Sequence, residues 1–273
     1  MNNFTQNVPN LLAVLRKSLE VSKALETSII TIGGYRDLPN QIVWVGNPEI
    51  IGPAKLTLPP LTKDAIYKES NPSLIFTNDQ ELMFITWDKC WVLKGMKWVY
   101  HSKFNNTRKN AIVVKMPNGI YAFGGENFLV SSSFEFLPNG STEWQSGPDI
   151  IEEGLFEASG IAISSTELLL IGGQKFKSKP TVHRNLEDNL GILKINIQTN
   201  QCTHIGTLPM PASNVQSAIF NDMIIITIEK DDFRFGTTSE TAILTLQKSR
   251  TTNGELIAHE INLISLEIAA ATK

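Results

Sequence analysis

The residues best suited to chemistry in this 273-residue chain are cationic and aromatic side chains in two short segments. The first segment combines five basic or histidine side chains with only two acids, Glu187 and Asp188; the five are Lys175, Lys177, Lys179, His183 and Arg184. The second is Phe233-Arg234-Phe235, an arginine between two aromatic rings. Arginine and aromatic residues contribute much of the binding energy at protein interfaces. These residue types therefore predict non-covalent binding of a protein partner, with an acidic peptide segment as the first candidate.

The sequence contains no recognisable catalytic or metal-binding pattern. The four histidines, at positions 101, 183, 204 and 259, lack the His-x-x-x-His and His-Glu-x-x-His spacings, and no Cys-x-x-Cys occurs. The chain also has no Gly-x-Ser-x-Gly nucleophile motif and no Gly-x-x-x-x-Gly-Lys phosphate loop. We therefore predict that the protein is not an enzyme and uses no metal or cofactor.

The strands that must hold the two binding segments form an internal repeat. Three apolar runs end in paired glycines, at residues 30–34, 121–125 and 169–173. Two further runs, 81–87 and 223–229, follow the same pattern without the glycines. A period of roughly 40 to 50 residues is typical of a propeller or a solenoid. We expect each run to be the second strand of one unit, ending at Gly34, Trp87, Gly125, Gly173 or Glu229.

Turn residues divide each unit into four short strands. In the fourth unit, the breaks predict strands at 160–164, 167–172, 191–197 and 201–206. In the third unit, Asn-Gly pairs at 118–119 and 139–140 predict two hairpin turns, because such pairs favour tight turns between apolar strands. In the fifth unit, we expect the final strand at 256–261, with the next apolar run completing an edge.

The repeated strand ending in Gly-Gly resembles the kelch repeat, as do a tryptophan in the last strand of the unit, Trp98 and Trp144, and Leu-Pro exits at 58–59 and 208–209. The resemblance covers about residues 17 to 265. It implies an all-β fold, a kelch-type β-propeller of about five four-stranded antiparallel blades. Three arrangements are open: a ring of five blades, a ring with a sixth blade assembled from the termini, or an incomplete six-bladed ring.

This organisation predicts a single propeller domain over residues 17–273, preceded by an extension at 1–16. The expected units are 17–62, 63–108, 109–150, 151–212 and 213–265. Paired glycines allow the backbone to approach other chain segments closely, where a side chain would crowd. We assign this structural role to six residues: Gly33, Gly34, Gly124, Gly125, Gly172 and Gly173.

The segments after the glycine positions should emerge on one face, together with the links between units. The kelch resemblance implies a non-catalytic scaffold that binds a protein through these loops. The candidate binding residues are Arg36, Lys175, Lys177, His183, Arg184, Phe233, Arg234 and Phe235. Two alternatives stay open, since related propellers include enzymes, either sugar-processing or oxidase-like, and since exposed aromatics such as Trp44 and Trp91 suit a carbohydrate-binding module.

Net charge and hydropathy bear on the protein's partners and on its location in the cell. The formal net charge of −3 gives no sign of a general nucleic-acid-binding surface, which would require a strong basic excess. No apolar run approaches the roughly 20 residues of a transmembrane helix. The first residues show no basic segment followed by an apolar one, so we predict a cytoplasmic location, or secretion if a leader has been lost. Cys90 and Cys202 fall in different units, and we expect both to be free thiols.

Overall fold

The computed structural model describes residues 29–31, 35–38, 41–44, 49–51, 72–79, 81–94, 97–127, 129–176, 186–208, 215–220, 223–232, 237–247, 249–250, 256–257 and 263–270. The chain divides into two compact regions, Met1–Lys68 with Lys94–Trp98, and Glu69–Leu93 with Val99–Lys273. In the first region, β1 (Ile29–Thr31) pairs antiparallel with β4 (Glu49–Ile51). Between them in the chain, β2 (Tyr35–Leu38) and β3 (Gln41–Trp44) form an antiparallel hairpin.

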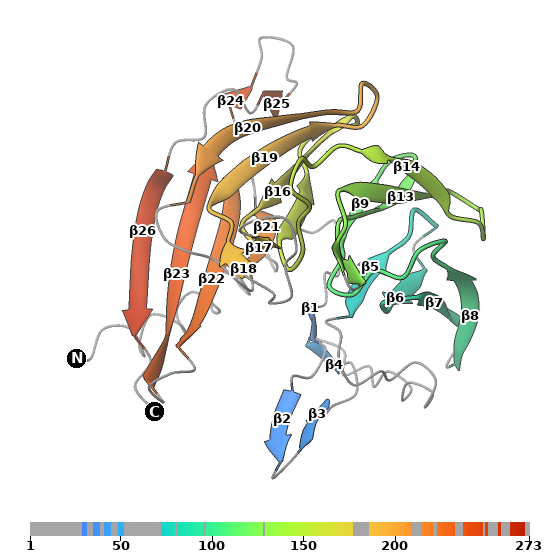
Figure 1. Ribbon diagram of the computed structural model, residues 1–273, viewed down its shortest axis with the longest axis horizontal. Helices are drawn as coiled ribbons and strands as arrows, with labels where there is room; N and C mark the ends of the chain where they lie inside the picture. Colours follow the sequence, from blue (N-terminus) through green and yellow to red (C-terminus); the bar gives the residue numbers. More distant parts are fainter. Residues whose placement is uncertain are drawn as a thin grey trace. The chain divides into compact units, whose positions relative to one another are not determined.

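The rest of the described chain is built from four-stranded antiparallel sheets (Figure 1). The first two sheets consist of β5 (Ser73–Phe76), β6 (Leu82–Ile85), β7 (Lys89–Lys94) and β8 (Lys97–Lys103), and of β9 (Ile112–Met116), β10 (Gly119–Phe123), β13 (Ser133–Pro138) and β14 (Gln145–Asp149). The next two consist of β15 (Ser159–Ala162), β16 (Glu167–Ile171), β19 (Gly191–Asn196) and β20 (Gln201–Thr207), and of β21 (Val215–Phe220), β22 (Met223–Asp232), β23 (Thr237–Gln247) and β26 (Leu263–Ala270). In each sheet the strands are neighbours in chain order.

Short hairpins interrupt this regular order. The pair β11 (Glu126–Asn127) and β12 (Leu129–Val130) lies between β10 and β13 in the chain, and β17 (Gln174–Phe176) and β18 (Leu186–Asp188) lie between β16 and β19. A third pair, β24 (Ser249–Arg250) and β25 (Leu256–Ile257), lies between β23 and β26. The hairpins add length to a unit without changing the order of its sheet.

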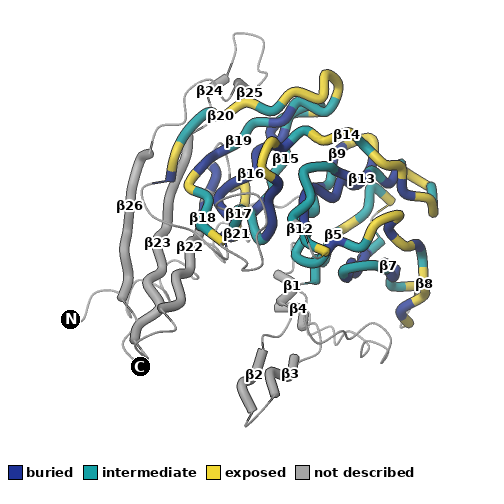
Figure 2. Tube along the Cα trace, viewed as in Figure 1, coloured by how far each residue is buried: buried dark blue, intermediate teal, exposed yellow. Residues whose placement is uncertain are grey.

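The hydrophobic core lies between successive sheets. In β16, Leu168 and Leu170 join a cluster shared with the β9–β14 sheet, whereas Leu169 and Ile171 join a cluster shared with the β21–β26 sheet. A third cluster joins the β5–β8 and β9–β14 sheets. Side chains alternate between the two faces of a strand, so a second strand covered on both faces is a continuous apolar run. Figure 2 shows buried residues along strands of the three sheets between β5 and β20.

The predicted all-β fold is confirmed for the described residues, and four-stranded antiparallel sheets repeat from β5 to β26. The described strands of the first predicted unit differ from the prediction, because β1 to β4 form two two-stranded sheets. In the fourth predicted unit, each of the four strands lies within two residues of its expected bounds. Both predicted hairpin turns are found. Pro117 and Asn118 join β9 to β10, with Gly119 as the first residue of β10, and Asn139-Gly140 follows β13 in the connection to β14. Residues 17–28 and the glycines at 33 and 34 lie outside the described residues.

Three details of the prediction were wrong. Trp144, expected in the last strand of its unit, lies immediately before β14. The strand β22 does not end at Glu229 but runs to Asp232, where it still pairs with β23, since no glycine pair turns the chain out of the ladder there. The last strand of the final sheet is β26 rather than 256–261, because the apolar run at Leu263–Ala270 supports a longer ladder with β23.

Candidate functional site

Paired glycines end the central strands β10 and β16 by turning the chain against the links that join successive sheets. Gly124 and Gly125 have φ angles of +60° and +83°, and Gly172 and Gly173 have +67° and +84°, in the left-handed region that favours glycine. A Cβ atom on Gly124 would lie 1.9 Å from the carbonyl oxygen of Leu155. The expected close backbone approach is therefore present, and the nearby backbone belongs to the link between two sheets.

The segments after these glycines lie beside the links that join successive sheets. The backbone N–H groups of Lys109 and Glu126 donate to each other's carbonyl oxygens at 2.9 and 2.8 Å. Phe156 and Gln174 make the equivalent pair one unit later, at 3.1 and 2.8 Å. We call the surface formed by β11–β12, β17–β18 and the links at 104–111 and 150–158 the post-glycine face. The shared face expected from the sequence is thus found in two successive units.

The one predicted binding cation whose side chain is described, Lys175, already has acidic partners on this face. Its Nζ donates to Glu153, and it lies 3.5 Å from Oε1 of Glu187. The hydrogen bond to Glu153 raises the pKa of Lys175, and the two carboxylates add to this effect. The lysine therefore stays charged, and part of its charge is neutralised within the protein.

The side chains of the other predicted binding residues lie outside the described part of the structure. Arg36 lies on β2 in the first compact region, where the backbone alone is described. The remaining members lie outside the described residues; they are Lys177, His183, Arg184, Phe233, Arg234 and Phe235. The segments that carry them begin in the hairpin strand β17 and at the end of β22.

An acidic group on the post-glycine face was not anticipated from the sequence. The carboxyl group of Glu157 lies in the link before β15, and burial raises its pKa, with smaller contributions from Glu126 and Asp188. Asn110 Nδ2 donates to Glu157 Oε1 at 2.8 Å, which holds the carboxyl group in place. The three acids come from three separate segments, so no local motif brings them together. In the sequence, the only sign of this acidic group is that each of the three acids follows a glycine pair or lies in a link between sheets.

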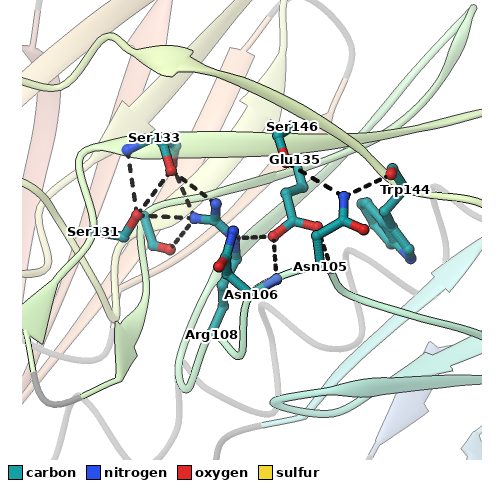
Figure 3. Close-up of polar contacts among 9 residues, drawn as sticks. Asn105, Asn106, Arg108, Ser131, Ser133, Glu135, Trp144 and Ser146 are labelled. Carbon is teal, nitrogen blue, oxygen red and sulfur yellow. Dashed lines mark hydrogen bonds and ion pairs between the residues drawn. The ribbon is translucent and has the colours of Figure 1, made fainter.

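A second unanticipated feature is a buried polar network beneath this face (Figure 3). The Arg108 guanidinium donates from Nε to Oε1 of Glu135 at 3.1 Å, and the two side chains are 2% and 0% exposed. The Glu135 carboxylate also accepts backbone N–H groups from Asn105, at 2.7 Å, and Asn106, at 3.0 Å. The network fixes the link at 104–111 onto strand β13. The pattern of β13 gave a hint, because Glu135 interrupts an apolar strand.

The same guanidinium also holds the glycine turn. Arg108 donates from one terminal nitrogen to the carbonyl oxygens of Gly124, at 2.8 Å, and Ser133, at 3.1 Å, and from the other to the Ser133 hydroxyl at 2.8 Å. It also donates to the Ser131 hydroxyl at 3.1 Å. Among the described residues, no buried side-chain nitrogen or oxygen lacks a hydrogen-bond partner. These contacts make the base of the post-glycine face rigid.

Both cysteines are free thiols, and neither has the environment of a nucleophile. Burial raises the pKa of Cys90 to about 12, outweighing the opposing hydrogen bonds with Ser102 and Trp144. Burial also raises the pKa of Cys202. Reactive cysteines have lowered pKa values, so both side chains have a packing role instead.

In the described part of the chain, no group of three or more His, Cys, Asp or Glu side chains is arranged to hold a metal ion. No helix long and apolar enough to cross a membrane is found among these residues either.

The successive four-stranded antiparallel sheets are consistent with a β-propeller-like fold. No family model matches the chain, and no curated protein matches it. Among solved structures, the fold is similar to that of YjhT, with 13% sequence identity, a TM-score of 0.58, and coverage of 84% of this chain and 80% of that chain. At this identity the similarity concerns the fold alone, and a fold of this kind does not by itself indicate a function.

Proposed function

We propose that the protein is a kelch-type β-propeller that acts as a non-catalytic scaffold and binds a protein partner through the post-glycine face. The observation that carries this proposal is the backbone pairing of Lys109 with Glu126 and of Phe156 with Gln174. It brings links and hairpins from successive units to one surface, supported by buried sheets. Loops held on a rigid framework are a common location for binding residues.

The partner segment that we propose is acidic. Arg234, between Phe233 and Phe235, would provide the principal contact, with Lys177 and Arg184 from the preceding unit as further cations. An arginine can bind a carboxylate through two parallel hydrogen bonds, and aromatic neighbours favour such contacts by stacking on its plane. Close to the sheets, Glu126, Glu157 and Asp188 would repel an acidic partner. We therefore assign recognition to the loop residues, with little contribution from Lys175, which is already paired.

Two other functions remain candidates, and the same preparation of protein tests them. An enzyme of the propeller class would turn over a sugar or oxidise a substrate, and a carbohydrate-binding module would retain glycans. Affinity capture with the immobilised full chain, followed by titration of the captured partner, tests protein binding. Metal analysis and a glycan screen are run alongside. Saturable glycan binding without a protein partner, or turnover of a sugar, would contradict the proposal.

A further inference from the structure

Two asparagine–glycine pairs of the β9–β14 sheet differ in how the glycine is held. Asn118 and Asn139 are both exposed. Gly119, however, is buried in β10, where it pairs with β9 on one side and with β13 on the other. Gly140 is exposed in the turn that follows β13, and an added Cβ would have no atom within 4 Å. A third pair, at 253–254, lies outside the described residues. Of the two described pairs, the one at 139–140 has room for its main chain to rearrange.

An asparagine followed by glycine can undergo a reaction between its side chain and the main chain. The amide nitrogen of the glycine loses its proton to the solvent and attacks Cγ of the asparagine, and glycine favours the attack because it has no Cβ to obstruct it. Nδ2 takes a proton from the solvent and leaves as ammonia, so that a five-membered succinimide ring remains. Addition of a water molecule opens the ring, at Cγ to give aspartate or at the main-chain carbonyl to give isoaspartate. Water is consumed, ammonia is released, and no oxidation or reduction takes place.

The contacts of Asn139 favour this reaction, whereas those of the other pair oppose it. Asn78 Nδ2 donates to Asn139 Oδ1 at 2.6 Å, and a donor at this oxygen stabilises the negative charge that develops there when the nitrogen attacks Cγ. Asn139 Nδ2 donates to the carbonyl oxygen of Pro117 at 2.8 Å, an exposed contact that water can replace as ammonia leaves. In the other pair, ring formation would pull the nitrogen of Gly119 out of its position between two strands. A Cβ at Gly119 would lie 2.2 Å from the carbonyl oxygen of Leu137, so this backbone has little room to shift.

We propose that Asn139 is a site of spontaneous deamidation in the folded protein, with water as the co-reactant, and that the sheet protects Asn118. The modification has a structural consequence. It removes Nδ2, the donor to Pro117, and introduces a negatively charged carboxylate in the turn. An isoaspartate also lengthens the main chain of the turn by a methylene group. The contact between the turn after β13 and the turn between β9 and β10 is therefore lost. This reaction does not depend on the post-glycine face or on any partner.

Peptide mapping by mass spectrometry measures deamidation at each asparagine after incubation of the full chain in mildly alkaline buffer. The incubation uses water enriched in heavy oxygen and the digestion uses ordinary water, so that products of the two stages have different masses. In the native protein, the rate at Asn139 should exceed the rate at Asn118 by at least about tenfold, which is about 1.4 kcal/mol of activation free energy. In urea the two rates should converge, because the sheet no longer holds Gly119. Isoaspartate at position 139 is detected by enzymatic methylation of its carboxylate.

Two variants test the route of the reaction. Gly140→Ala should slow deamidation at Asn139 by about tenfold or more, because the added Cβ obstructs the attacking nitrogen. Asn78→Ala should slow it severalfold, since the donor to Oδ1 is lost. Urea denaturation of each variant shows that it is folded under the conditions of incubation. Equal rates at Asn118 and Asn139 in the native protein would overturn the proposal. Absence of product at Asn139 in a native protein whose denatured chain reacts, or a wild-type rate in Gly140→Ala, would also overturn it.

Discussion

Arg108 and Glu135 form a buried ion pair between a link and the strand β13, with 3.1 Å between Nε and Oε1. The carboxylate accepts two backbone N–H groups besides the guanidinium, and the guanidinium donates to Gly124 and Ser133. Each charge therefore has polar partners in place of water. Removal of one member would leave the other buried and uncompensated, which is the costly situation for such pairs.

Glu135→Ala should consequently lower the free energy of unfolding by about 3 to 5 kcal/mol. Urea denaturation at neutral pH measures the change. The matched control is Glu143→Ala at an exposed position, where we expect a change within about 0.5 kcal/mol. A similar small loss in both variants would show that the network does not hold the link onto β13.

The glycine turns can be tested by comparing two glycines that both have positive φ angles. Gly140, at φ +72°, has no atom within 4 Å of an added Cβ, whereas a Cβ on Gly124, at φ +60°, would meet the Leu155 carbonyl oxygen at 1.9 Å. Gly140→Ala should cost about 1 to 2 kcal/mol of stability, the strain of a left-handed residue alone. Gly124→Ala should cost clearly more, because a backbone segment must also shift. Equal losses in denaturation experiments would contradict the close approach.

Glu157 should make the stability of the protein depend on pH. Its pKa is raised in the folded state above the ordinary value of 4.5, mainly by burial and then by Glu126 and Asp188. Between the unfolded and the folded pKa the native state binds more protons, so stability is greatest below this interval and falls as pH rises through it. Glu157→Gln retains an oxygen that can accept from Asn110 and removes the charge.

Thermal unfolding of the wild type and of Glu157→Gln from about pH 4 upward measures this effect near the carboxyl pKa range. We expect the variant to be the more stable at neutral pH, with the difference shrinking as the solution is acidified. Glu143→Gln provides the exposed control. A wild type that gains stability relative to Glu157→Gln as pH rises would show that the carboxylate is favourably placed in its charged form.

The two thiols should react slowly in the native protein. With a pKa of about 12, Cys90 holds almost no thiolate near pH 8, and the raised pKa of Cys202 also disfavours its thiolate. Alkylation by iodoacetamide should therefore be slow until denaturant is added, with the half-buried Cys202 reacting before the buried Cys90. Mass spectrometry of a non-reducing digest should find no link between them. Rapid alkylation of Cys90 in the native protein would contradict its buried position.

Local signals in the sequence predicted much of the sheet structure. The bounds of β16 and β19 follow from their apolar runs and from turn residues beside the strands, which act over a few positions. The Arg108–Glu135 pair could not be predicted in this way, since its members are 27 residues apart and meet through packing. The association of Glu157 with Asp188 likewise depends on how a link and a hairpin come together in space.

The predicted binding contribution of Arg234 exceeds that of Lys179, because a guanidinium between aromatic rings makes planar, paired contacts that a flexible ammonium group cannot. Arg234→Ala should weaken binding of the captured acidic partner by roughly 1 to 3 kcal/mol, the range of interface hot spots. Lys179→Ala should mainly change the association rate and its dependence on salt. Thermal unfolding of both variants should match the wild type, since the sequence predicts that neither side chain belongs to the core. Titration of the partner against the two variants decides the matter: equal affinities, or a loss that accompanies unfolding, would remove this face as the binding surface.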